Sequence, residues 1–297
     1  MSGLWKTHIL IDGRNLCRMF YWKKDEVPAV RVSVDRKTTI ITRFVKLLCE
    51  LKSMNADADI CVIWDDDSVR RKYEAVTQGV SAVARHAAYH SCEGEDVLTQ
   101  TAYMKAQILP CLGISQFTSS GHEAYDVIYS FIAGQDNASV GKIIIVSTDR
   151  IYYQFLTDDI TVFNPSSGKM VDKVSFTSEK GFSPVLWKDY WTLTGGGKKD
   201  AFSIAGCGDK TATELIREYG NLLEIIKGIS QKEKRTKIEQ DILDNCSVLR
   251  VGLDRIKPDM CGVISLFQNH SRKEEDIKGL MIKWGLVSLI RYAKYFV

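Results

Sequence analysis

Three acidic residues follow apolar runs of the sequence at the point where each run ends. Asp12 closes the run HILID, Asp65 follows DICVIW, and Asp149 follows KIIIVST. Carboxylates that lie close together repel one another, and a cation that neutralises them favours their charged form. An all-oxygen site of this kind suits Mg²⁺ or Mn²⁺. Two such ions about 4 Å apart can activate a water and stabilise the leaving oxygen in phosphodiester cleavage.

Two further acids, Glu123 and Asp126, stand in the first turn of the helix that GHEAYDVIYSFIAG predicts over 121–134. Acids are also favoured in first turns because they accept hydrogen bonds from backbone N–H groups and interact with the helix dipole. For any single acid this capping role explains its position as well as metal binding does. For the whole set, which follows three buried strands, the sequence favours a metal site. Asp66 and Asp67 fit a solvated turn.

The elements that would position these acids alternate between strand and helix along the first two-thirds of the chain. The apolar runs 8–12, 59–64, 142–148 and 159–165 predict strands, and TIITRFVKLLCELKS (39–53) predicts an amphipathic helix. Continuous apolar strands separated by helices predict an α/β fold with a mostly parallel central sheet flanked by helices. Ligands of such sheets bind beyond the carboxyl ends of the strands, which is where the three acids stand.

The last third begins with a glycine-rich stretch, AGCGDKTATELIREYG, which leads into a helix. Gly206 and Gly208 permit close approach of the backbone, and N–H groups at the following helix start can hold a phosphate. Lys210 and Thr211 stand beside the same position. The alternative is a tight turn capped by Asp209 or Thr211.

Composition bounds the class of protein. The chain has 297 residues, 45% hydrophobic and 26% charged, with a formal net charge of +3. These values are typical of a globular protein, and no apolar stretch approaches the ~18 residues that span a bilayer. Eight cysteines are scattered without a CxxC pair. We therefore expect reduced thiols, a cytoplasmic location and no membrane partner.

Five segments together resemble the structure-specific 5′ nucleases of the flap endonuclease family, and most of all the exonuclease/RNase H proteins of tailed phages. In family order they are HILIDGRN, VIWDDDSVRRKYEAV, GHEAYDVIYSFIA, IIIVSTDRIYYQFLTDDITVFNP and GGGKKDAFSIAGCGDKTATELIREYGNLLEII. The resemblance implies a PIN-like nuclease domain over 1–190 and, over 191–297, a helical domain with a helix-hairpin-helix-type DNA-binding module.

The resemblance also implies the site, its cofactors and its partners. Catalytic acids and metal ligands would be Asp12, Asp65, Glu123, Asp126 and Asp149, with Asp200 as a further ligand. The cofactor would be Mg²⁺ or Mn²⁺, with K⁺ at the 206–211 hairpin. Partners would be DNA or RNA·DNA with 5′ single-stranded ends, together with other replication proteins in a phage-infected bacterial cell. Nucleic-acid-binding residues would be Arg70, Arg71, Lys72, Lys198, Lys199, Gly206, Gly208, Lys210 and Thr211.

The chain departs from the family pattern at several functional positions. Tyr125 and Ile151 each stand where the family has an acid, and Gln78 stands where it has a lysine near the scissile phosphate. In the loop before the hairpin the family has two acids. Gly196 stands at the position of the first. The position of the second is occupied by Lys199 or, if the loop has one extra glycine, by Asp200. The second metal site is therefore weakened.

Two functions follow from the weakened site. One is an active 5′-3′ exonuclease/flap endonuclease of RNase H type that acts on replication intermediates. The other is a catalytically impaired member that binds branched or single-stranded nucleic acid within a replication or transcription assembly. Interleaved charges in QKEKRTKIEQD favour a solvated helix over a basic binding face, and GGGKK lacks the spacing of a nucleotide-binding loop. Aromatic residues such as Trp187 and Tyr190 could stack bases, although such residues more often lie in cores.

Overall fold

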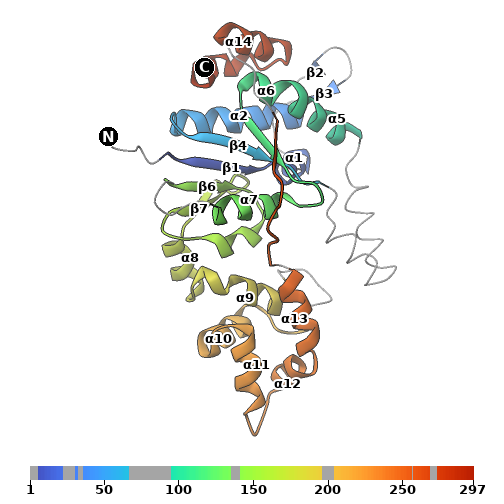
Figure 1. The fold of residues 1–297 in the computed structure, drawn as a ribbon, viewed down its shortest axis with the longest axis vertical. Coiled ribbons are helices and arrows are strands. Elements are labelled where there is room, and N and C mark those ends of the chain that lie inside the picture. Colours follow the sequence, from blue (N-terminus) through green and yellow to red (C-terminus); the bar gives the residue numbers. More distant parts are fainter. Residues whose placement is uncertain are drawn as a thin grey trace. The chain divides into compact units, whose positions relative to one another are not determined.

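The computed structural model describes residues 6–22, 31–32, 36–66, 95–134, 141–195, 204–255, 257–267 and 273–297 (Figure 1). The chain forms two compact units. The first comprises Met1–Thr148, Phe163–Gly168 and Asp259–Val297, and the second comprises Asp149–Val162 and Lys169–Pro258. Among the described segments, no helix combines the length and the apolar character needed to cross a membrane.

A seven-stranded sheet has the order β8-β7-β6-β1-β4-β5-β9. β1 pairs in parallel with β4 and β6, and β4 pairs in parallel with β5, whereas β9 is antiparallel to β5. The predicted α/β fold with a mostly parallel sheet is thereby confirmed. The strands are β1 (His8–Asp12), β4 (Asp59–Ile63), β5 (Ser115–Thr118), β6 (Ile143–Val146), β7 (Ile160–Asn164), β8 (Lys169–Val171) and β9 (Ser265–Phe267), and a separate antiparallel pair is formed by β2 (Arg31–Val32) and β3 (Arg36–Lys37).

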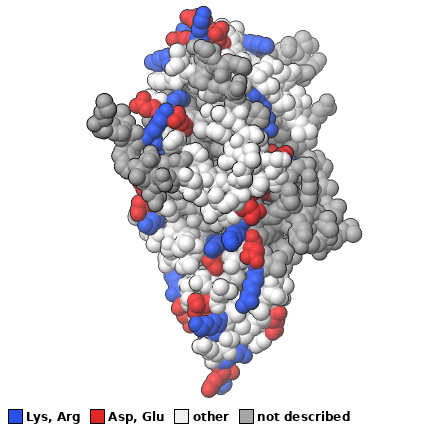
Figure 2. All heavy atoms as spheres, in the orientation of Figure 1, with Lys and Arg blue, Asp and Glu red and all other residues white. Residues whose placement is uncertain are grey.

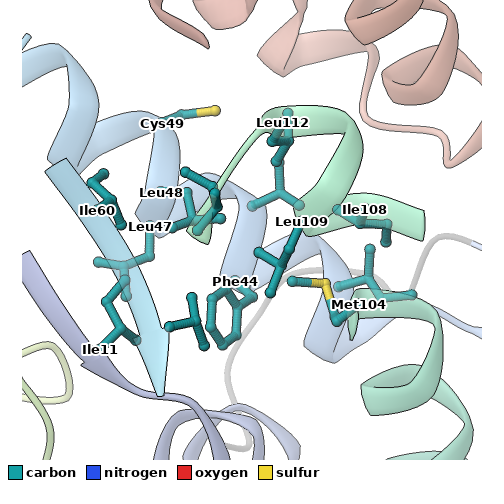
Figure 3. Close-up of a cluster of buried hydrophobic side chains, with 14 of the residues drawn as sticks. Ile11, Phe44, Leu47, Leu48, Cys49, Ile60, Met104, Ile108, Leu109 and Leu112 are labelled. Atoms are coloured by element: carbon teal, nitrogen blue, oxygen red, sulfur yellow. The ribbon is translucent and has the colours of Figure 1, made fainter. Parts of the chain in front are cut away.

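The helices of the first unit bury one face each against this sheet or against one another. The predicted amphipathic helix is α2, and its predicted apolar face is buried at Ile40, Phe44, Leu47, Leu48 and Leu51. Figure 3 shows this face packing against residues of β1, β4, η1 and α6. The helical segments are α1 (Gly13–Trp22), α2 (Thr39–Met54), α5 (Glu95–Tyr103), the π-helical η1 (Met104–Ile108), α6 (Leu109–Leu112), α7 (Ala124–Ala133), α14 (Glu274–Lys283) and the 3₁₀ segment η5 (Val287–Phe296).

The C-terminal part of the chain returns to the first unit. Residues 259–267, here called the strap, run beside α7 and end in β9 (Figure 1). Besides the β9–β5 ladder, the strap is fastened by hydrogen bonds from Asp259 N–H to Asp126 Oδ1 at 2.9 Å, from Cys261 N–H to Ser130 Oγ at 2.7 Å, and from Ser119 Oγ–H to the Val263 carbonyl at 2.6 Å. α14 then joins the core through Ile277 and Met281. The two units are divided at other residues than the domain boundary expected near residue 190. The expected division into domains 1–190 and 191–297 stays a prediction.

The second unit is mostly helical and is organised around aromatic side chains. The Trp187 ring lies 4.8 Å from that of Tyr190 and 5.3 Å from that of Phe176, measured between centroids. Trp187 and Tyr190 are buried. Of the two predicted roles, stacking on bases and packing in the core, the structure shows core packing. The helices are η2 (Arg150–Phe155), α8 (Lys173–Lys180), η3 (Pro184–Leu186), α9 (Trp187–Thr194), α10 (Asp209–Tyr219), α11 (Leu222–Ser230), α12 (Lys237–Asp244) and α13 (Cys246–Arg255).

Candidate active site and nucleic-acid elements

The carboxyl ends of β1 and β4 bring Asp12 and Asp65 to one edge of the sheet. Asp12 is the last residue of β1 and lies opposite Ile63 of β4, so Asp65 follows two residues beyond it. Because neighbouring parallel strands end at the same edge, both carboxylates belong to the crevice region that ligands of such sheets occupy. We call this region, with Glu123 and Asp126 at the start of α7, the acidic edge.

Asp12 is held by the loop that follows β6. Its Oδ2 accepts a hydrogen bond from the Ser147 hydroxyl at 3.2 Å, and its Oδ1 accepts one from Asn15 N–H at 3.2 Å. Asn15 in turn accepts from both the N–H and the hydroxyl of Thr148, each at 2.9 Å. The carboxylate is 8% exposed, so these donors orient a nearly buried acid.

Asp65 is tied to the start of α7. Its Oδ1 accepts a hydrogen bond from Ala124 N–H at 2.7 Å, in the first turn of that helix. Asp66 is exposed, as expected for a solvated position, and its carboxylate also accepts a hydrogen bond from Gly121 N–H at 3.1 Å. A carboxylate that accepts N–H bonds at a helix start is stabilised in its charged form.

Glu123 and Asp126 lie at the same helix start, and Asp126 is the more buried. Asp126 is 1% exposed; its Oδ2 accepts from Glu123 N–H at 3.2 Å, and its Oδ1 accepts from Asp259 N–H of the strap at 2.9 Å. Tyr125, which stands where the family has an acid, is buried. Asp126 thus performs a structural task, and its predicted role as a metal ligand stays a prediction.

Asp149 belongs to the second unit and caps η2. Its Oδ1 accepts a hydrogen bond from Ile151 N–H at 2.9 Å. The side chain therefore satisfies a backbone donor at a 3₁₀-helix start, which is the capping role that the sequence left open for each acid.

Metal binding is consistent with the kind of donor at the acidic edge. Asp12, Asp65 and Glu123 supply hard carboxylate oxygens, which Mg²⁺ and Mn²⁺ prefer. Within the described residues, however, no three His, Cys, Asp or Glu side chains are grouped as a metal centre would need. The structure thus shows a suitable donor set whose oxygens are engaged by the protein's own hydrogen bonds.

Two basic residues near the acidic edge were not predicted as part of the site. Arg14, in the first turn of α1, places Nη1 3.9 Å from Asp65 Oδ2. Lys105 of η1 places Nζ 4.5 Å from the ring centroid of Trp64, the residue before Asp65. Arg14 follows Asp12 by two residues, and this short spacing is a local signal that places it near the acidic edge. Lys105 carried no local signal, because only the fold brings η1 to β4.

Gly13 explains how α1 comes so close to Trp64. A Cβ atom at position 13 would lie 2.6 Å from Trp64 Cε3, so a larger residue would force the two elements apart. The glycine after Asp12 therefore serves close packing, and it sets the distance between the start of α1 and the end of β4.

The glycine hairpin of the second unit has the backbone that its sequence predicts. Gly206 has φ +82°, a left-handed conformation that favours glycine, and Gly208 is the N-cap of α10. Lys210 and Thr211 lie in the first turn of that helix. Asp209 accepts hydrogen bonds from the Tyr190 hydroxyl and from Lys180 Nζ, and the Tyr190 bond is the main cause that holds the pKa of Asp209 below its usual range.

Charge around the helices of the second unit is balanced. The helix predicted from Gln231 begins only at Lys237, and Lys232 lies in the turn between α11 and α12, where it pairs with Glu239 at 2.7 Å and with Glu218 at 3.8 Å. On the face drawn in Figure 2, acidic and basic side chains of the described residues intermingle and do not gather into one positive patch. The remaining predicted residues lie outside the described part of the chain: Arg70, Arg71, Lys72, Lys198, Lys199 and Asp200.

Residues 7–181 match the family model described as the 5′-3′ exonuclease N-terminal, resolvase-like domain. The chain belongs to this family. The match confirms the predicted family.

Individual relatives are consistent with this assignment. The chain is 24% identical over 258 residues to the flap endonuclease Xni of Tolumonas auensis, an alignment that covers 86% of this chain and 94% of Xni. It is 27% identical over 251 residues to the thermostable DNA polymerase I of Thermus aquaticus, which covers 84% of this chain but only 28% of the polymerase.

A solved structure shows the same fold. The bacteriophage T5 flap endonuclease, in a pseudo-enzyme-product complex with DNA and metal ions, matches with a TM-score of 0.65 and 17% identity over 98% of both chains. At this identity the likeness establishes the fold alone, and it confirms the predicted PIN-like α/β fold.

Proposed function

We propose that this chain is a metal-dependent, structure-specific 5′ nuclease that cuts DNA or RNA·DNA replication intermediates near a 5′ single-stranded end. The observation that carries the proposal is the placement of Asp12 and Asp65 at adjacent carboxyl ends of parallel strands, inside the segment that matches the 5′-3′ exonuclease family. The flap endonuclease Xni and the phage T5 enzyme, which is solved with DNA and metal ions, support the same class of substrate.

Asp12, Asp65 and Glu123 would hold Mg²⁺ or Mn²⁺, and Asp126, Asp149 and Asp200 are further proposed ligands. When bound, the ion would supply an activated water and stabilise negative charge on the phosphate. The chain's own contribution is orientation. Ser147 and Asn15 hold the Asp12 carboxylate, and the Ala124 N–H holds that of Asp65, so the acids keep their positions.

Nucleic acid would bind to the hairpin of the second unit, where Gly206, Gly208, Lys210 and Thr211 precede or begin α10. N–H groups at a helix start and a lysine contact phosphate without reading sequence, which suits an enzyme that recognises structure. We also propose K⁺ at this hairpin and phosphate contacts from the basic residues at 70–72 and 198–199. The bacterial relatives favour action in the bacterial cytoplasm; phage origin and RNase H activity stay predictions.

A second candidate function is a catalytically impaired member that holds branched nucleic acid for a replication assembly. The arrangement of Asp126 favours it: both carboxylate oxygens accept backbone N–H bonds, and the neighbouring Tyr125 is buried instead of being an acid. Each missing or engaged ligand weakens stabilisation of the transition state, where a single preorganised contact can contribute about 3 kcal/mol.

Cleavage of a 5′-labelled flap substrate in Mg²⁺ and then in Mn²⁺ tests the proposal. The double variant Asp12→Asn/Asp65→Asn removes both charges while keeping side-chain size and oxygens that can accept hydrogen bonds. The matched control Asp57→Asn/Asp158→Asn removes two charges at exposed positions. We expect the wild type and the control to cleave, and the double variant to bind the flap without cutting it. Tight binding by all three proteins without cleavage would establish the second candidate instead.

A further inference from the structure

Two positive side chains reach the acidic edge from different elements of the first unit. The Arg14 guanidinium, from α1, lies 3.9 Å from the Asp65 carboxylate, and the side chains are 18% and 10% exposed, respectively. The Lys105 ammonium, from η1, lies over the Trp64 ring at 4.5 Å. Charges this poorly hydrated interact more strongly than charges at the surface, because water screens them less.

The surroundings of Lys105 act on its pKa in opposite directions. Burial is the main cause that lowers the pKa of Lys105, and the Arg14 guanidinium lowers it further. The carboxylates of Asp65 and Asp66 raise the same pKa. The Lys105 ammonium thus lies within electrostatic reach of Arg14 and of both acids.

A positive charge near the acidic edge stabilises the buried carboxylates there. Asp12 and Asp126 are almost completely buried and Asp65 is nearly so, and buried carboxylates raise the free energy of the folded state unless they are paired. Hydrogen bonds from backbone N–H groups offset part of this cost. Arg14 places a positive charge 3.9 Å from Oδ2 of Asp65, whose Oδ1 accepts from Ala124 N–H at the start of α7.

We propose that Arg14, assisted by Lys105, is a built-in counter-charge that competes with a divalent cation for the Asp65 carboxylate and so weakens metal binding at the acidic edge. This inference rests on the proposed function, in which the same carboxylate holds a metal ion. A divalent ion bound to Asp65 Oδ2 would stand close to the guanidinium, and like charges at such distances repel. Metal binding therefore requires Arg14 to move away or to bear that repulsion.

The consequence is a metal affinity set partly by a residue that is not itself a ligand. Removal of the Arg14 charge relieves the repulsion and removes one interaction that competes for the Asp65 carboxylate, and both effects favour the metal. Lys105 has no ion pair with Asp65 among the described contacts, so its removal acts in the same direction with a smaller effect.

The test measures Mn²⁺ binding alone, by electron paramagnetic resonance titration of the full chain without nucleic acid. The variants are Arg14→Gln, Arg14→Lys, Lys105→Met and Lys46→Gln. Lys46 is the matched control, because it lies in α2 with 58% of its side chain exposed and pairs only loosely, at 3.9 Å, with Glu50. Asp65→Asn, alone and combined with Arg14→Gln, identifies the site that is titrated.

We expect Arg14→Gln to bind Mn²⁺ about tenfold more tightly than the wild type, and Lys105→Met two- to threefold more tightly. Arg14→Lys, which keeps the charge, and Lys46→Gln should bind like the wild type. In the Asp65→Asn background the Arg14→Gln gain should vanish. An unchanged or weaker affinity in Arg14→Gln would overturn the proposal, as would a gain that persists without Asp65. If Arg14→Gln does not fold, Lys105→Met decides by the same criterion.

Failure of this inference can be told apart from failure of the proposed function. Tighter Mn²⁺ binding in Arg14→Gln with no flap cleavage by any variant would support the counter-charge and overturn the nuclease. Flap cleavage by the wild type with equal Mn²⁺ affinity in all Arg14 variants would support the nuclease and overturn the counter-charge.

Discussion

Asp126 and Asp189 are buried aspartates in the first turns of helices, one in each unit of the chain. Asp126 of α7 is 1% exposed and Asp189 of α9 is 2% exposed. Both oxygens of Asp126 accept backbone N–H bonds, from Glu123 and from Asp259. Asp189 Oδ1 accepts from Leu222 N–H at 2.9 Å, whereas its Oδ2 has no hydrogen-bond partner within the described part of the chain.

The difference shows that burial alone does not say what a carboxylate does. A buried charge that accepts several N–H bonds can be retained in its ionised form, and the segments that donate those bonds are fixed by it. A buried charge with one oxygen unsatisfied raises the free energy of the folded state. Asp126 therefore fastens the strap to α7, whereas Asp189 joins α9 to α11 at a cost in stability.

Asp126→Ala gives the largest expected effect. The substitution leaves the N–H groups of Glu123 and Asp259 without their acceptor, and the free energy of unfolding should fall by about 3 kcal/mol in urea denaturation. Asp172→Ala is the control, because Asp172 is an exposed N-cap of α8 whose Oδ1 accepts a hydrogen bond from Ser175 N–H. We expect clearly less loss there. Equal losses in the two variants would show that the strap contact contributes little.

Ser130→Ala tests the strap at its second attachment. The Ser130 Oγ accepts a hydrogen bond from Cys261 N–H at 2.7 Å, one turn of α7 beyond Asp126. We expect a loss of about 1.5 kcal/mol in the same measurement, since the partly buried Cys261 N–H loses its acceptor. Ser53→Ala, at an exposed position where Oγ only donates to a carbonyl of its own helix, should change little. Identical values for the two serines would argue against a fastened strap.

Asp189→Asn should stabilise the folded state, whereas Asp126→Ala should destabilise it. Asparagine keeps an oxygen for Leu222 N–H and removes the buried charge, so unfolding at pH 7 should require about 1 kcal/mol more free energy. Burial raises the pKa of Asp189, so the wild type gains stability as pH falls through that pKa. The advantage of asparagine should therefore shrink in acid. A loss of stability at pH 7 would mean that the charge itself is needed.

Lys210→Ala gives the smallest expected effect on the fold and bears on the hairpin of the second unit. Lys210 is exposed in the first turn of α10, so unfolding should be unchanged. Affinity for duplex DNA should fall a few-fold, and the slope of log affinity against log salt should decrease by about one. Lys227→Ala is the control, since Lys227 pairs with Glu224 on α11. The same slope in both variants would place the DNA contact elsewhere.

Much of the fold could be predicted from local patterns. HILID and DICVIW are continuous apolar runs, and they form the central parallel strands β1 and β4; the apolar face of 39–53 is the buried face of α2. β5 and β9 were not predicted, because SQFT and SLF are too short and too mixed in polarity to stand out as strands. Their pairing depends on the strap, whose attachment points lie more than 100 residues apart in sequence.

The acidic edge could be predicted in part for the same reason. Strand ends are local features, so the sequence alone places Asp12 and Asp65 together once a parallel sheet is assumed. It does not reveal that Asp126 binds the strap, nor that Arg14 and Lys105 approach Asp65. Those contacts join elements that are far apart in the sequence, and no local sequence pattern indicates that the elements meet.

The sequence by itself determined which residues could carry chemistry: acids at the ends of buried strands, and a glycine turn before a helix. It did so because apolar periodicity and glycine conformation act over a few residues. Only the tertiary structure decided how those groups are used, since hydrogen bonds and charges act between any atoms that the fold brings close. That is why Asp126, read as a ligand in sequence, is found holding the strap, and why Arg14 is found beside Asp65.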